Sequence, residues 1–162
     1  MSMSVPVAAP RRADTAHTES PIIVVGYDGS EESRHAVAVA AERAGPMGTV
    51  IPLHVTGTAS SWLGTPYYER EVEAGYHAAQ AVLAEIDEIH TGDASIEPEL
   101  IEGDPAEALM RIAKSRGATE IVVGSRGRGR FRSILGSVSH ELLERADRLV
   151  VIVPRGAVDD DH

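Results

Sequence analysis

Residues 21–45, which read PIIVVGYDGSEESRHAVAVAAERAG, carry the pattern that decides the fold. The run Ile22–Val25 is continuously apolar and is followed by the turn residues 28–30, as in a strand that is buried on both faces. Apolar residues then recur three and four positions apart between 37 and 44, the spacing of one helix face, until Gly45 and Pro46 end the pattern. The stretch therefore predicts a buried strand, a turn and a packed helix.

The same alternation of apolar runs and helical patterns continues along the chain. Four more strands are predicted, at Val50–Val55, Ile96–Ile101, Ile121–Val123 and Leu149–Val153. Prolines at positions 52 and 98 weaken the second and third of the five strands, because proline cannot donate a ladder hydrogen bond. Five strands separated by four helices predict an α/β fold: a single-domain, doubly wound, five-stranded parallel sheet with helices on both faces.

Local signals also place the helices. One face of the long second helix is marked by four apolar residues, Val72, Ala79, Leu83 and Ile86. The third helix is predicted to begin after the N-cap Asp104 and to end at Gly117. Ser137 is predicted to cap the fourth helix.

Composition bounds the class of protein. The chain has 162 residues, of which 43% are hydrophobic, and it has no cysteine. This predicts one domain with a sizeable core and excludes disulfides, iron–sulfur clusters and cysteine nucleophiles. Residues 1–20 are predicted to form a disordered N-terminal tail, residues 21–155 the domain, and residues 156–162 an acidic C-terminal tail. No apolar run approaches the roughly 20 residues of a spanning helix, so we expect a cytoplasmic protein with no membrane partner.

The charge balance argues against nucleic acid as a partner. The formal net charge is −10, whereas nucleic-acid binding needs a broad basic surface. One loop is an exception, because it holds four arginines, Arg126, Arg128, Arg130 and Arg132. They would serve as a clamp for phosphate groups or simply as a solvated basic loop.

That loop belongs to the most informative segment of the chain, residues 124–139, GSRGRGRFRSILGSVS. Glycines let backbone N–H groups approach a phosphate, and the start of the following helix attracts anions. The segment therefore indicates a phosphate site, although a glycine-rich turn with a capping serine would show the same spacing. It is neither a Walker A loop nor a dinucleotide fingerprint, because the lysine of the first and the third glycine of the second are missing.

The sequence offers little for catalysis. His140 and Glu144 lie one helical turn apart, but the second histidine of a zinc protease motif is missing, so a surface ion pair is predicted. No nucleophile elbow and no convincing carboxylate pair occurs. We therefore expect no catalytic residues, no metal site of the protein's own, and binding in place of fast chemistry.

Together the motifs resemble the universal stress protein family, over roughly residues 20 to 154. The resemblance rests on VVGYDGS at 24–30, on EGDP at 102–105, and on VGSRG at 123–127 running on to GSVS at 136–139. It implies an adenine nucleotide alpha hydrolase-like fold and a regulatory role in the stress response with bound ATP, AMP or cyclic AMP. Mg²⁺ would arrive with the nucleotide. The resemblance also implies a homodimer that forms through the last strand.

The family's site residues carry over to matching positions. Asp28 would contact the ribose region, Gly26 and Tyr27 would line the same edge, and the backbone of Val55 would meet adenine. The phosphates would be held by Gly124, Gly127, Gly136, Ser137, Val138 and Ser139, and the nucleotide-binding set also includes Ser125 and Arg126. Without the resemblance, Asp28 and Gly29 form a turn that opens a helix.

The chain departs from the ATP-binding branch of the family at one point. That branch has nine residues between its second and third glycines, whereas eight residues separate Gly127 from Gly136 here. The missing residue shortens the reach of the loop by at most ~3.5 Å, which Gly129 can absorb. Two further hypotheses therefore stay open: a dimeric interaction module of the same fold that no longer binds nucleotide, and a slow ATP hydrolase.

Overall fold

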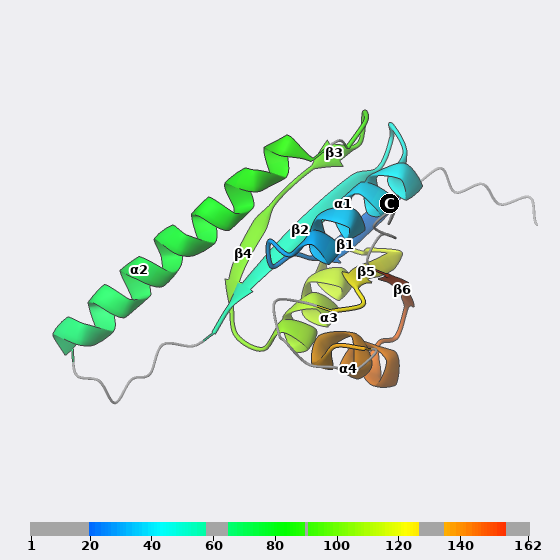
Figure 1. The fold of residues 1–162 in the computed structure, drawn as a ribbon. Helices are drawn as coiled ribbons and strands as arrows, with labels where there is room; N and C mark the ends of the chain where they lie inside the picture. Colours follow the sequence, from blue (N-terminus) through cyan, green and yellow to red (C-terminus); the bar gives the residue numbers. More distant parts are fainter. Residues whose placement is uncertain (1–19, 58–64, 90, 127–134, 155–162) are drawn as a thin grey trace, which may run out of the picture.

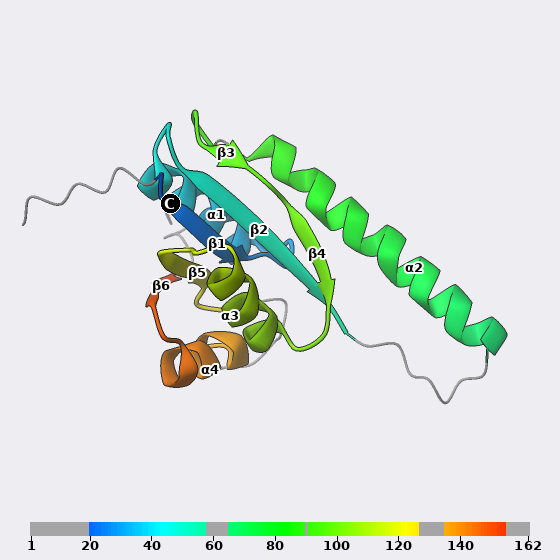
Figure 2. The same cartoon turned by 180° about the vertical axis from the view of Figure 1, so that it is seen from behind.

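A computed structural model of the chain describes residues 20–57, 65–89, 91–126 and 135–154 (Figures 1 and 2). The elements in chain order are β1 (Ile22–Gly26), α1 (Glu31–Ala44), β2 (Thr49–Thr56), α2 (Thr65–Ala84), the 3₁₀ helix η2 (Glu85–Glu88), β3 (Ser95–Ile96), β4 (Glu99–Glu102), α3 (Pro105–Ser115), β5 (Glu120–Gly124), α4 (Ser137–Arg145) and β6 (Leu149–Val153). All strand pairs are parallel, in the order β3-β2-β1-β5-β6, with β4 also paired to β2. The predicted parallel α/β fold is confirmed.

The sheet has six strands because the predicted third strand is split into β3 and β4. Both segments keep one register on β2, since Val50 pairs with Ile96 and Leu53 pairs with Glu99. The backbone N–H and C=O groups of the even-numbered β2 residues point toward β3 and β4, as the bond from the Glu97 N–H to the Val50 carbonyl shows. Pro52 is one of these residues and has no N–H, so the ladder lacks a hydrogen bond opposite Glu97 and the strand is interrupted there.

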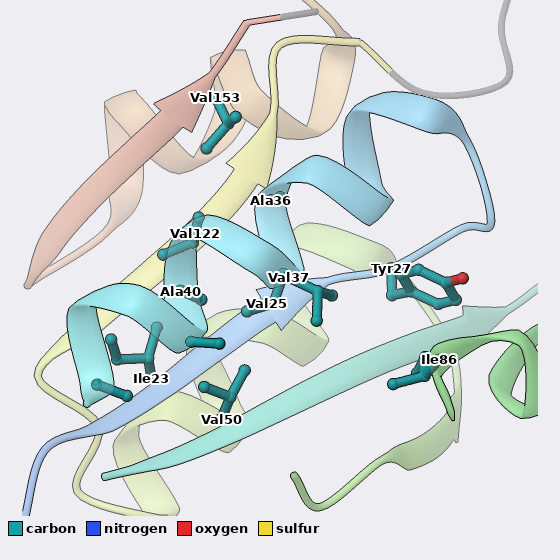
Figure 3. Close-up of a cluster of buried hydrophobic side chains, with 12 residues drawn as sticks. Ile23, Val25, Tyr27, Ala36, Val37, Ala40, Val50, Ile86, Val122 and Val153 are labelled. Carbon is teal, nitrogen blue, oxygen red and sulfur yellow. The ribbon is translucent and has the colours of Figure 1, made fainter. Parts of the chain in front are cut away.

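Helices cover both faces of the sheet, because alternate residues of each buried strand point to opposite sides. Ile23 and Val25 of β1 pack with α1, η2 and Tyr27 in one cluster of buried side chains (Figure 3). Val24 between them packs on the other face with Leu109 of α3 and Leu142 of α4. The continuous apolar run of β1 thus fills two cores, as the sequence predicts.

Helix α2 follows the prediction only in its second half. Ala79 is buried, and Leu83 and Ile86 pack on the core around β1 and β2. Val72, which was predicted on the same face, is 40% exposed. Figures 1 and 2 agree that the first half of α2 projects beyond the body of the sheet. The apolar face of the helix is therefore longer than the surface on which it packs.

The end of α3 is secured by a side chain from another element. Gly117 follows the helix with a φ of 64°, the left-handed conformation that glycine favours, as predicted. Arg148, between α4 and β6, donates from Nη1 to the Ala113 carbonyl at 2.8 Å and to the Ala118 carbonyl at 2.9 Å. Its side chain is only 15% exposed, and it adds a second donor to the Ala113 carbonyl, which also accepts the Ala118 N–H at 2.8 Å, so it secures the turn that follows the helix.

We expect Arg148→Ala to lower the free energy of unfolding by about 2–4 kcal/mol, because two hydrogen bonds from a charged, largely buried donor are lost. Urea titration followed by circular dichroism measures this loss. Arg148→Lys, which keeps one donor group at the end of a long chain, should recover part of the stability. Equal stability of Arg148→Ala and wild type would contradict the bridging role.

Candidate functional site

A cavity of about 280 Å³ opens at the carboxyl ends of β1, β2 and β5. This is where ligands bind in open parallel sheets. The cavity is lined by ten of the predicted site residues, Gly26, Tyr27, Asp28, Val55, Gly124, Arg126, Gly136, Ser137, Val138 and Ser139. Of the remaining two, Ser125 is not part of the lining and Gly127 lies outside the described residues.

The cavity also has walls that sequence reasoning missed. These are Ser33, Leu53, His54, Pro105, Leu109, Val123 and Leu135. The strand positions among them follow from the alternation of β2 and β5 once the strand order is known. Pro105 and Leu109 come from the first two turns of α3 and Ser33 from the first turn of α1, and of these only Pro105 belongs to a motif quoted above, EGDP. The apolar members give the cavity a surface suited to a flat ring system.

The residues that follow β1 are fixed by the packing of Tyr27 in the core and by a hydrogen bond to Asp28. Tyr27 is 2% exposed and its side chain belongs to the buried cluster, while the residue also lines the cavity (Figure 3). Asp28 accepts the Ser30 N–H at 2.9 Å through Oδ1, and Ser30 caps α1. The turn interpretation of Asp28 is therefore correct, and the same residue lines the cavity. A Cβ on Gly26 would lie 3.1 Å from Val123 Cγ1, so a larger residue would crowd the base of the cavity.

At the end of β5 the backbone ties the glycine loop to α4. The Gly136 N–H donates to the Ser125 carbonyl at 2.7 Å, and the Ser139 hydroxyl donates to the Gly124 carbonyl at 2.9 Å. Ser139 is 3% exposed. Its only donor proton is thus directed at the protein, so any contact of Ser139 with a phosphate would not use this donor. Ser139 fixes the start of α4 against β5 instead.

Three helices begin around the cavity, and their N-termini differ in chemistry. Ser30 caps α1, which has two glutamates in its first turn, and Asp104 caps α3, which has Glu107 in its first turn. The N-cap of α4 is Gly136, with φ −72° and ψ 162°, and not Ser137 as the sequence predicts. Glycine has no side chain to accept an N–H, and the first turn of α4 has no acidic residue. The start of α4 is therefore the one best suited to an anion.

The end of β2 presents backbone groups to the cavity. The backbone N–H and C=O groups of the odd-numbered β2 residues point toward β1. The Thr49 N–H donates to the Pro21 carbonyl, and the Leu53 carbonyl accepts from the Tyr27 N–H at 3.0 Å. The strand pairing ends at Gly26 with Leu53. Val55 is the next odd residue, so its N–H and C=O face the space beyond the end of β1. A residue in this position offers one donor and one acceptor side by side.

The described part of the chain holds no group of three or more histidine, aspartate or glutamate residues that could bind a metal ion. His140 lies 3.9 Å from Glu144 on α4, and both side chains are exposed, in line with the predicted surface pair. No described helix is long and apolar enough to cross a membrane.

Comparison with known proteins gives a consistent match. The model of the universal stress protein family matches residues 20–154. The universal stress protein in the QAH/OAS sulfhydrylase 3' region of Thermus aquaticus is 33% identical over 133 residues, covering 81% of this chain and 96% of that protein. The chain also matches a universal stress protein of Mycolicibacterium smegmatis at 37% identity but covers 47% of its length.

Several of the similar solved structures hold a nucleotide. A universal stress protein in complex with cAMP has a TM-score of 0.55 and 27% identity, with 84% of this chain and 98% of that chain covered. A family member from Arabidopsis thaliana with AMP bound has a TM-score of 0.61 and 20% identity, with 85% and 93% covered, which supports the fold alone.

Proposed function

Because the chain belongs to the universal stress protein family, we propose that its cavity binds an adenine nucleotide as a regulatory ligand in a stress response. The observation that carries the proposal is the pairing of two features in one cavity. The start of α4, with no side-chain cap, supplies N–H groups for phosphate, and the end of β2 supplies a backbone donor and acceptor for a base. The complex of a structural neighbour of 27% identity with cAMP supports the same ligand class.

The chemistry at Val55 favours adenine over guanine. On the edge that carries N7, adenine presents this acceptor ring nitrogen beside an amino donor, whereas guanine presents two acceptors, N7 and O6. A backbone N–H and C=O on one residue complement the adenine pattern. Apolar Leu109, Leu135 and Val138 line the same cavity and would contact the ring faces.

Calorimetric titration and thermal shift with ATP, AMP and cyclic AMP test the proposal. We expect saturable binding of at least one of them, with GMP bound more weakly. At 100 times its Kd a ligand stabilises the fold by about 2.7 kcal/mol, which is readily seen as a rise in Tm. No heat and no shift at millimolar nucleotide would refute the proposal and favour an interaction module of the same fold.

In this proposal ATP is retained and not consumed, and Mg²⁺ enters only with the nucleotide. Turnover with Mg²⁺ and ATP should stay below a few per minute, against a median of ~10 s⁻¹ for enzymes. Faster hydrolysis would favour the ATP hydrolase hypothesis. The cytoplasmic location stays a prediction from composition.

We also propose a homodimer formed through β6. This strand lies at one edge of the sheet, pairs only with β5 among the described strands, and is apolar along its whole length, with Leu149 54% exposed. The opposite edge is interrupted between β3 and β4 by the Glu97-Pro98 pair, which discourages strand addition. An apolar edge such as β6 invites pairing with a second copy.

Sedimentation of the wild type should give a species of twice 17.2 kDa. Leu149→Lys should shift the equilibrium toward the monomer, with less than about 0.5 kcal/mol change in the stability of the fold, because the side chain is exposed. A monomer at all concentrations would overturn this proposal.

A further inference from the structure

His54 stands at the junction of the two strand ends that border the base side of the cavity. Its Nδ1 lies 2.7 Å from the Tyr27 carbonyl oxygen. A carbonyl only accepts hydrogen bonds, so Nδ1 carries the proton and donates. The ring is part-buried and lines the cavity between Leu53 and Val55. The contact therefore connects β2 to the first residue after β1.

This hydrogen bond occupies the place of a ladder bond. In a parallel pair each N–H donates to the residue one before its opposite number. With Gly26 opposite Leu53, the next bond of the ladder would run from the Val55 N–H to the Tyr27 carbonyl. In the described part of the chain that bond is not formed, and the His54 ring donates to this carbonyl instead. The β1–β2 ladder thus ends one bond early.

We propose that His54 is a positioning residue for the ligand: by engaging the Tyr27 carbonyl, it keeps the Val55 N–H open to the cavity. The inference rests on the proposed nucleotide function and adds a residue to it. His54 needs no contact with the ligand in this role. It sets the backbone of Tyr27 and Asp28 on one side and leaves the donor of Val55 available on the other.

A first experiment needs no ligand. Amide hydrogen exchange at Val55, followed by NMR in the full-length chain, is compared among wild type, His54→Leu and His54→Asn. Leucine cannot donate, so position 54 no longer holds the Tyr27 carbonyl, the Val55 N–H can complete the ladder bond, and exchange at Val55 should slow by about 10-fold or more. Asparagine places an amide N–H close to the position of Nδ1 and should keep the fast exchange of the wild type. Equal exchange in wild type and His54→Leu would overturn the proposal.

A second experiment measures AMP affinity by calorimetry in the same proteins. We expect His54→Leu to weaken binding by about 10-fold or more, since a buried donor is no longer offered to the ligand, and His54→Asn to stay within about 3-fold of wild type. If His54→Leu does not fold, His54→Gln, whose amide lies one methylene farther out, takes its place with the same expectation. Wild-type binding with no difference between the variants would overturn the inference.

The two experiments separate the inference from the function on which it rests. If wild type binds no adenine nucleotide, the proposed function fails, and the exchange rates still decide whether His54 stops the ladder. If wild type binds and exchange at Val55 does not respond to His54→Leu, the function stands and the positioning role falls.

Discussion

Gly124→Ala should cost about 2–4 kcal/mol of unfolding free energy, a large effect for a single added methyl group. A Cβ at this position would lie 2.8 Å from Glu32 Cβ, 3.1 Å from the Glu32 carbonyl carbon and 3.1 Å from the Arg126 carbonyl oxygen. Two of these atoms are backbone, so the first turn of α1 or the glycine loop has to move. Gly124 thus lets α1 pack against the end of β5, in addition to any role toward a ligand.

Gly26→Ala provides the matched control for this variant. Gly26 ends β1 as Gly124 ends β5, but its added Cβ would meet only side-chain ends, Val123 Cγ1 at 3.1 Å and Leu109 Cδ1 at 3.3 Å. These can shift by a few tenths of an ångström, so the loss should be about 1 kcal/mol or less. Urea unfolding with unchanged m-values measures both variants. A smaller loss for Gly124→Ala than for Gly26→Ala would show that the contact with α1 does not limit residue size.

Gly136→Val should have the opposite signature: nucleotide binding weakened by about 100-fold or more, with unfolding free energy within about 1 kcal/mol of wild type. The backbone of Gly136 lies at φ −72° and ψ 162°, an extended conformation that valine adopts readily. The branched side chain would stand beside the N–H groups at the start of α4 and obstruct a phosphate. Calorimetry with the nucleotide that wild type binds and urea unfolding measure the two effects.

Gly75→Ala is the control for a glycine replacement without contacts. Gly75 lies within exposed α2, and an added Cβ would have no neighbour within 4 Å. This variant should be more stable by about 0.5–1 kcal/mol and bind as wild type does. If Gly136→Val keeps full affinity, the start of α4 is not the anion site, and the cavity would need another explanation.

The sequence predicts the sheet well because continuous apolar runs such as Ile22–Val25 have few alternatives to a buried strand. It fails where tertiary geometry decides. Pro52 visibly weakens a strand, but only the pairing shows that its missing donor falls on the β3/β4 side. Val72 fits the apolar face of α2, but no pattern shows that the sheet ends before the helix does.

For the site, glycines and turn residues are informative because their chemistry is local. Asp28, Gly124 and Gly136 each mark a strand end or helix start that borders the cavity. His54 gives no such signal, since a histidine in an apolar strand is equally typical of a satisfied core residue. Ser139 lines the cavity as predicted, but no local pattern shows that its hydroxyl donates to the Gly124 carbonyl. Both residues act through carbonyl partners that are distant in the sequence.

The interrupted ladder at Pro52 also bears on how the molecule opens. Beyond it, β3 and β4 are held to β2 by hydrogen bonds such as those from Ser95 to Gly48 and from Gly103 to Thr56. The central strands, in contrast, are buried on both faces. Under native conditions β3 and β4 should therefore detach together as a subglobal unit, while the strand ends of β1 and β5 that border the cavity stay in place. Thermal fluctuation would then be concentrated at the edge of the sheet farthest from β6.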